Sequence, residues 1–291
     1  MDMRCLCQQR AILGESPVWS AAENAVYWVN IPGKKIHRTN PETGRTRAWS
    51  LPARPGMIAL RRKGGLVVAL EDGLYGFDPG SGRLDRLVGI EADQPDNRPN
   101  DGKCDVAGRL WVGTVNITDG SRPTGSLYRV DPDLTVTRIE SGLRVPNGLA
   151  WNPTNDVMVH TDTRAGIVWS YAYDAKSSER LAKREFFRFD RGKTGGVDGA
   201  AMDAEGGYWT ALFGGGMLIR VTPDGRRDRD IPLPVSQPTM PAFGGTDMKT
   251  IFITSAARNL VDEVLKSQPC AGGLLALRVD VPGHEVYPFC G

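Results

Sequence analysis

Short apolar runs recur along the chain, and each follows a turn and is rich in Val, Ile, Trp or Tyr. One residue marks each run: Trp28, Val68, Trp111, Val159, Trp209 and Phe252, spaced by 40, 43, 48, 50 and 43 residues. A second turn follows most markers, at Asn40-Pro41, Asp78-Pro79, Asp131-Pro132 and Thr222-Pro223. Each unit therefore predicts four short strands, which is the period of a propeller blade.

Six such units account for the 291 residues, so we predict an all-β fold: a single six-bladed β-propeller domain over residues 1–291 with four antiparallel strands per blade. Residues 3–10 and 284–289 remain at the two ends, and we expect them to complete one blade together, so that the chain termini close the ring. The best helical pattern is short, at 259–265. A β-sandwich is the alternative, but it does not explain six regularly spaced markers.

The same repeat predicts a site. The first strand of each unit starts 11 to 13 residues before its marker, at Glu15, Met57, Asn100, Asn147, Asp198 and Pro241. Because innermost strands line the channel of a propeller, these six positions should surround one of its mouths. Four of them carry side-chain oxygens, which suit a hard divalent cation. Asn-Gly and Asp-Gly pairs also serve turns for purely backbone reasons, but Glu15 has no glycine after it.

Two loops should rise around this mouth. The segments 116–125 and 255–272 are longer than their counterparts in the other units, and both connect a second strand to a third. Long loops over a site commonly contact substrates or act as lids. Neutral surface insertions are the alternative.

Composition narrows the possible function. Lysine and arginine number 36 against 34 acidic residues, so the net charge of +2 gives no argument for nucleic-acid binding. No apolar run approaches the length of a membrane span, and the first nine residues lack the apolar region of a signal peptide. Five cysteines without C-x-x-C spacing favour neither a zinc cage nor a disulfide framework. We therefore expect a cytoplasmic protein, with a monomer slightly favoured.

The familiar nucleophile, phosphate-binding, dinucleotide-binding and zinc-protease motifs are absent from the sequence. The three histidines lie in different units, so they do not form a cluster. His160 ends a second strand and should lie near the predicted mouth, where it could contact a substrate, although a lone histidine is more often structural. A metal-dependent hydrolase is the enzyme class that needs nothing beyond the residues present.

Several segments resemble one family. They are Leu13-Gly14-Glu15-Ser16-Pro17-Val18-Trp19, Asn97-Arg98-Pro99-Asn100-Asp101-Gly102-Lys103, Arg109-Leu110-Trp111-Val112-Gly113-Thr114, Pro146-Asn147-Gly148-Leu149-Ala150-Trp151, Val197-Asp198-Gly199 and Gly244-Gly245-Thr246-Asp247. In this order they resemble the SMP-30/gluconolactonase/regucalcin family of six-bladed propellers that hydrolyse sugar lactones.

The resemblance implies roles for particular residues. Glu15, Asn147 and Asp198 correspond to the metal ligands of that family, and Arg98 and Asn100 to its substrate contacts. An acidic substrate contact of the animal proteins lies in the third-blade loop, where this chain has no glutamate at the expected place and Asp119 is the nearest substitute.

We therefore predict a divalent-metal-dependent lactonase that converts a sugar lactone, its small-molecule partner, to an aldonic acid. Asp198 would act as the catalytic base as well as a ligand. The cation could be Ca²⁺, Zn²⁺, Mn²⁺, Fe²⁺ or Mg²⁺, since these oxygen donors accept each of them. The alternatives are an organophosphate or other ester hydrolase on the same metal site, and a non-catalytic calcium- or sugar-binding propeller.

Overall fold

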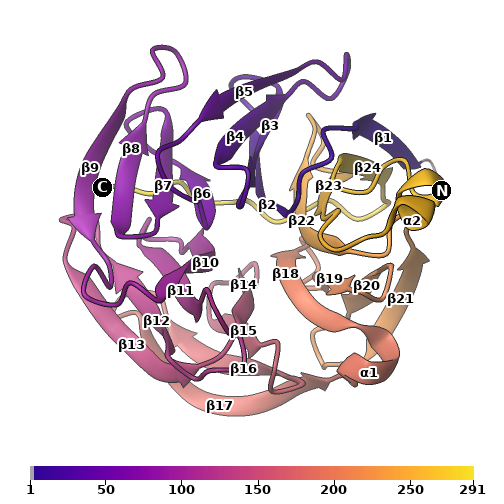
Figure 1. The fold of residues 1–291 in the computed structure, drawn as a ribbon. Helices are drawn as coiled ribbons and strands as arrows, with labels where there is room; N and C mark the ends of the chain where they lie inside the picture. Colours follow the sequence, from indigo (N-terminus) through magenta and orange to yellow (C-terminus); the bar gives the residue numbers. More distant parts are fainter. Residues whose placement is uncertain (1–2) are drawn as a thin grey trace.

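Six four-stranded antiparallel sheets form a ring in the computed structural model, which describes residues 3–291 (Figure 1). Met1 and Asp2, the start of the segment in which we expected no signal peptide, lie outside the described residues. The predicted six-bladed β-propeller with four antiparallel strands per blade is confirmed.

In the first three blades the chain runs outward from the innermost strand. Blade one consists of β2 (Gly14–Ser20), β3 (Ala25–Asn30), β4 (Lys35–Thr39) and β5 (Thr46–Ser50). Blade two consists of β6 (Met57–Leu60), β7 (Leu66–Leu70), β8 (Gly73–Phe77) and β9 (Leu84–Gly89). Blade three consists of β10 (Asn97–Cys104), β11 (Leu110–Asn116), β12 (Gly125–Val130) and β13 (Val136–Leu143).

Blades four and five repeat this order, and blade six combines strands from both parts of the chain. Blade four consists of β14 (Pro146–Trp151), β15 (Val157–Asp162), β16 (Ile167–Asp174) and β17 (Glu179–Arg188). Blade five consists of β18 (Gly196–Met202), β19 (Tyr208–Phe213), β20 (Met217–Val221) and β21 (Arg227–Pro232). Blade six consists of β22 (Pro238–Gly244), β23 (Thr250–Ser255), β24 (Leu274–Arg278) and, as its outermost strand, β1 (Met3–Cys7).

The repeat read from the sequence corresponds to the blades. All six markers lie in second strands, namely β3, β7, β11, β15, β19 and β23. Their apolar side chains pack between neighbouring blades, and each of the six contacts between adjacent blades contains its own cluster of buried residues. Burial of these clusters is the main stabilising contribution to the ring, and it also fixes the inner strands that carry the site.

The C-terminal segment does not join a blade, so the expectation that 284–289 would share a sheet with 3–10 is wrong for that segment. The backbone of His284 bonds to Met202 in blade five, and that of Phe289 bonds to Leu60 in blade two. The yellow segment therefore runs across the ring to the C mark near β7 (Figure 1). It covers the end of the channel where the inner strands finish.

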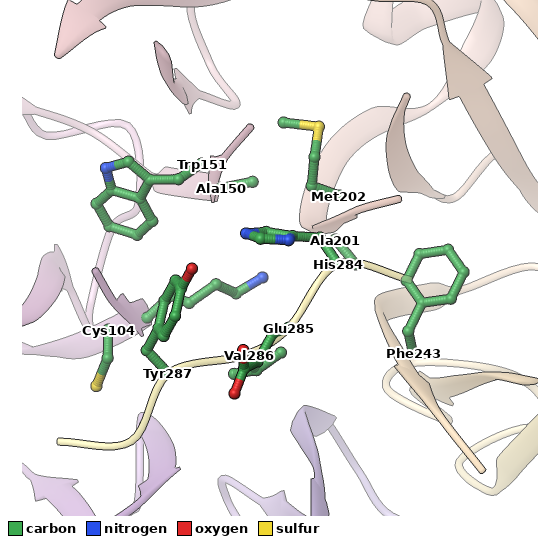
Figure 2. A pocket seen from close by; sticks show the side chains of 11 residues that line it. Cys104, Ala150, Trp151, Ala201, Met202, Phe243, His284, Glu285, Val286 and Tyr287 are labelled. Carbon is green, nitrogen blue, oxygen red and sulfur yellow. The ribbon is translucent and has the colours of Figure 1, made fainter. Parts of the chain in front are cut away.

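A small cavity of about 30 Å³ remains under this segment. Figure 2 shows His284 and Tyr287 of the segment facing Trp151, Cys104 and Met202, which come from the ends of the inner strands. The carbonyl of Met202 accepts the backbone N–H of His284 at 2.9 Å. Because this end of the channel is filled by the segment, the larger opening lies at the other end.

Two short helices interrupt the all-β pattern. α1 (Arg191–Thr194) lies between blades four and five, and α2 (Asp262–Ser267) lies in the long loop of blade six, close to the predicted helical segment 259–265. No helix in residues 3–291 has the length and apolarity needed to cross a membrane. All five cysteines are free thiols.

Candidate functional site

A cavity of about 580 Å³ opens at the end of the ring where the inner strands begin. The five residues of the predicted metal and substrate site all line it: Glu15, Arg98, Asn100, Asn147 and Asp198. They come from four different blades, so no single segment of the chain contains the site.

A β-bulge brings these side chains to the channel. The pairing register between first and second strands shifts beside Glu15, Asn100, Asn147 and Asp198, and also in β22, but not in β6. A bulge re-aims side chains and ends regular pairing, and bulges are common beside active sites. Ser16 and Gly148, each following a site residue, have φ values of 49° and 62°.

Position 148 requires a glycine for two reasons: its positive φ, and the lack of space for a side chain. A Cβ at this position would lie 2.2 Å from the Tyr208 hydroxyl, which donates to the Gly148 carbonyl at 2.8 Å. No larger residue fits without displacing this contact. The Asn-Gly pair therefore has a backbone purpose here, and the asparagine still faces the site.

Hydrogen bonds fix the orientation of the Asn147 amide. Its Nδ2 donates to Thr163 Oγ1 at 2.9 Å, and Thr163 in turn donates to the Val197 carbonyl at 2.7 Å. Its Oδ1 accepts from Asn100 Nδ2 at 2.8 Å. A carbonyl oxygen has two lone pairs, so Asn147 retains one for a further partner.

Arg98 and Asn100 are held in the same hydrogen-bond network. Arg98 donates to Asn100 Oδ1 at 3.1 Å and to the Pro99 carbonyl at 2.6 Å. Asn100 also donates to the Pro146 carbonyl at 3.1 Å. These contacts leave further N–H groups of the guanidinium available toward the cavity.

The surroundings of the site raise the pKa values of its two carboxylic acids. Burial, followed by repulsion from Asp101, raises the pKa of Glu15 to about 8. Burial, with repulsion from Glu15 and Asp101, raises the pKa of Asp198 well above its ordinary value. Acidic groups in such surroundings are typical of sites that bind a cation or move a proton.

The donor set fits a divalent cation. Glu15, Asn147 and Asp198 offer oxygens from two carboxylates and one amide, which are ligands preferred by hard cations. A cation would also remove the repulsion between these two half-buried carboxylates. Within residues 3–291 no group of three or more His, Cys, Asp or Glu side chains could hold a metal, so a site here depends on the amide.

Other sequence expectations have different outcomes. Met57 is buried in the core between blades two and three, and Pro241 lines a smaller cavity deeper in the ring. Asp119 lies in the predicted loop, but its carboxylate accepts from the backbone and hydroxyl of Ser121 and does not line the cavity. His160 is buried and is also not among the lining residues.

The two long loops do line the cavity. Asn116, Ile117, Thr118 and Gly120 come from the first, and Arg258 and Asn259 from the second. Both therefore rise around the polar mouth, as their lengths predicted. The helix α2 follows Arg258 and Asn259 in the chain.

Sequence reasoning missed several charged residues. Asp101 lies close enough to Glu15 and Asp198 to raise the pKa of both, and its Oδ1 has no hydrogen-bond partner in the described part of the chain. Burial raises the pKa of Asp101, and attraction to Lys103, which donates to the Ala200 carbonyl at 2.6 Å, opposes this shift. Three arginines of the rim were also missed: Arg164, Arg191 and Arg258.

Comparisons with known proteins point in one direction. A family model described as SMP-30/Gluconolactonase/LRE-like region matches residues 13–257. A 6-deoxy-6-sulfogluconolactonase from Pseudomonas putida is 38% identical, with 99% of each chain covered. Regucalcin from Gallus gallus is 32% identical, over 100% of this chain and 99% of its own. The crystal structure of a calcium-binding regucalcin from Agrobacterium tumefaciens superposes with a TM-score of 0.93 at 29% identity, covering 99% and 97% of the two chains.

Proposed function

Because this chain belongs to the SMP-30/gluconolactonase/LRE-like family, we propose that it hydrolyses a sugar lactone to the corresponding aldonic acid with the help of one divalent cation. The observation that carries the proposal is that five side chains from four blades meet in a single polar cavity: Glu15, Asp198, Asn100, Asn147 and Arg98. Names of relatives that denote lactonases support the reaction class.

Glu15, Asn147 and Asp198 would hold the cation. When bound, it would supply Lewis-acid polarisation of the lactone carbonyl. Thr163 accepts from the Asn147 Nδ2 and Asn100 donates to the Asn147 Oδ1, so the two bonds fix which side of the amide carries the oxygen. Such outer contacts fix a ligand's orientation and tune its affinity.

Asp198 would move the proton. In its ionised form the carboxylate accepts a proton from the attacking water as the water oxygen bonds to the carbonyl carbon. The bond between that carbon and the ring oxygen then breaks, and the ring oxygen takes up a proton to become a hydroxyl. One water is consumed and one aldonic acid is formed.

Arg98 and Asn100 would hold the sugar. Arg98 is fixed by its bonds to Asn100 and Pro99, so its remaining N–H groups are directed without further ordering cost. Prearranged donors of this kind position a hydroxyl-rich substrate for attack. These residues suit a polar ring better than an apolar ester.

The experiment measures hydrolysis of gluconolactone through the protons that it releases. The protein is assayed after treatment with a chelator and again after reloading with Ca²⁺, Zn²⁺, Mn²⁺, Fe²⁺ or Mg²⁺. We expect activity to disappear with the chelator and to return with one or more of the ions. Asp198→Asn should lower kcat by about 10²- to 10⁴-fold, the usual contribution of a general base. Asp133→Asn, an exposed turn carboxylate, is the control.

Two results would contradict the proposal. Full activity in the chelated protein would show that the reaction needs no cation. Near-normal turnover by Asp198→Asn at saturating cation would show that Asp198 is not the base. A phosphotriester assayed in parallel tests the organophosphate alternative. Tight Ca²⁺ binding without turnover of any lactone would favour the calcium-binding alternative, which the similarity to the calcium-binding regucalcin from Agrobacterium tumefaciens supports.

A further inference from the structure

Arginine dominates the charge around the cavity. Five arginines line it, at positions 54, 98, 164, 191 and 258, against the two carboxylates of Glu15 and Asp198. The two carboxylates would be balanced by a divalent cation. An excess of positive charge then remains around the rim, and it requires an explanation beyond holding neutral sugar hydroxyls.

The arginines differ in how far the protein itself satisfies them. Arg54 forms an ion pair with Glu71, and Arg98 donates to Pro99 and Asn100. By contrast, Arg164, Arg191 and Arg258 have no carboxylate within ion-pair distance in the part of the chain that the structure describes.

Arg164 and Arg191 are neighbours on the rim. A Cβ at Gly196 would lie 3.5 Å from Arg191 Nε and 2.8 Å from the Thr163 methyl group. The guanidinium of Arg191 therefore extends over the start of β18, beside the residue that precedes Arg164. Burial, followed by repulsion from Arg164, lowers the pKa of Arg191.

Nearby acidic groups are already used. The Asp162 carboxylate accepts backbone N–H groups of Arg144, Val145 and Arg164 at 2.9, 3.0 and 3.0 Å. Asp119 contributes attraction to Arg164, but its own carboxylate accepts from Ser121. The backbone bond to Asp162 also fixes the turn that carries Arg164.

We propose that Arg164 and Arg191 form a subsite for a terminal oxyanion of the substrate, so that the preferred lactone carries a sulfonate, phosphate or carboxylate at the carbon farthest from the lactone carbonyl. This inference rests on the proposed function. Two guanidinium groups present parallel N–H donors that match the oxygens of such an anion. The anion would also relieve the repulsion between the two arginines.

The two arginines lie close in the chain to residues that contact or precede Asn147 and Asp198, where the lactone carbonyl would react. Thr163 joins the two regions, because its hydroxyl bonds Asn147 while its neighbour in the chain is Arg164. Arg191 reaches Gly196, two residues before Asp198. A sugar whose carbonyl lies near Asn147 and Asp198 therefore directs one of its edges toward this pair.

The test compares kcat/KM for gluconolactone with kcat/KM for the same lactone carrying phosphate, sulfonate or carboxylate at C6. We expect the metal-loaded protein to prefer one of the charged lactones by about 10- to 100-fold, the equivalent of one or two charge-assisted hydrogen bonds. Arg164→Gln and Arg191→Gln should each raise KM for that lactone about tenfold and leave the neutral one within about threefold.

Lys193→Gln is the matched control. It removes the same charge from the same helix, but Lys193 pairs with Asp190 and does not line the cavity. The preference should survive this change and should weaken with added salt, since the subsite lies on the rim. The three charged lactones identify which oxyanion is recognised.

Two outcomes separate this inference from the proposed function. Equal turnover of neutral and charged lactones, unchanged in Arg164→Gln and Arg191→Gln, would overturn the subsite while the lactonase stands. If no lactone is hydrolysed, calorimetry with gluconate and 6-phosphogluconate still tests the subsite. Arginine-dependent preference for the phosphorylated acid would support it, and equal binding would overturn it.

Discussion

At the residue scale, the cavity depends on side chains that never touch the proposed cation. Thr163 shows this most clearly, because one hydroxyl accepts from Asn147 Nδ2 and donates to the Val197 carbonyl. It thereby connects blade four to the strand that carries Asp198. Together with Asn100, it fixes the orientation of the Asn147 amide, whose reversal would present a nitrogen instead of an oxygen to the proposed cation.

We therefore predict that Thr163→Val weakens cation affinity by about 10- to 100-fold, the usual effect of removing an outer contact of a ligand. At saturating cation, kcat should recover to near its original value, because Thr163 positions a ligand and takes no part in proton transfer. Thr163→Ser keeps the hydroxyl and should restore affinity. Calorimetric titration of the chelated protein with Ca²⁺ or Mn²⁺ measures the change, and unchanged affinity in Thr163→Val would contradict the role.

At the element scale, buried aspartates join strands within and between blades. Asp203 accepts from Trp209 Nε1 at 2.8 Å, from Arg220 Nε at 2.7 Å and from the Gly207 backbone at 2.7 Å. Asp105 makes the equivalent contacts to Trp111 and Arg109, and it also accepts from Tyr173 of the next blade. Each carboxylate has several donors, which offsets the cost of its burial.

Arg220 allows two of its partners to be compared directly. Asp203 is fully buried, whereas the Asp228 side chain is 34% exposed and pairs with the same arginine at 2.7 Å. Asp203→Ala should lower the free energy of unfolding by about 3–5 kcal/mol, because it leaves the Trp209 indole N–H and the Nε–H of Arg220 buried without a partner. Asp228→Ala should cost less than about 1 kcal/mol. Urea unfolding measures both, and similar costs would show that burial does not decide the contribution.

The elements also show where sequence reasoning succeeded and where it could not. Apolar runs at a regular spacing locate the second strands, since those strands are buried between blades. Polar residues at the start of the first strands then locate the cavity. Asp101 escapes this reasoning because consecutive residues of a regular strand face opposite sides, and only the bulge between Pro99 and Gly102 brings it near Glu15 and Asp198.

Residues outside the repeat could not be predicted from the sequence for a different reason. Arg164 and Arg191 come from a turn and a one-turn helix, where no periodicity indicates which way a side chain faces. The C-terminal segment has no strand partner along its length, apart from isolated bridges at Gly283 and Phe289. Its position is set by backbone hydrogen bonds to blades two, three, five and six, which no local pattern encodes.

At the scale of the whole molecule, two buried histidines connect stability to pH. His37 stacks on Trp28 with 4.2 Å between ring centroids, and neither of its ring nitrogens has a hydrogen-bond partner within residues 3–291. Burial, with repulsion from Lys35, lowers the pKa of His37 to about 4. Burial, with opposing effects of nearby charges, lowers the pKa of His160 to about 4 as well.

These lowered values fix the sign of the dependence. Between the unfolded pKa of about 6.5 and the folded value, the unfolded chain binds protons that the folded protein does not. The stabilising contribution is therefore complete above pH 6.5 and is lost as pH falls toward 4. The carboxylates of the cavity titrate with the opposite sign when no cation is bound, since the pKa of Glu15 is raised to about 8. Saturating cation keeps them ionised and removes this opposing effect.

We predict that, at saturating cation, each histidine accounts for a loss on the order of 2–3 kcal/mol in the free energy of unfolding between pH 6.5 and 4. His37→Phe, which keeps the stacked shape, and His160→Gln should each flatten this dependence, and the double variant should flatten it most. Urea unfolding at half-unit pH steps provides the comparison. His284 is retained in every protein, so its own titration cancels from the differences. An equally steep loss in the double variant would assign the acid sensitivity to other groups, and the buried histidines would then be ordinary members of the core.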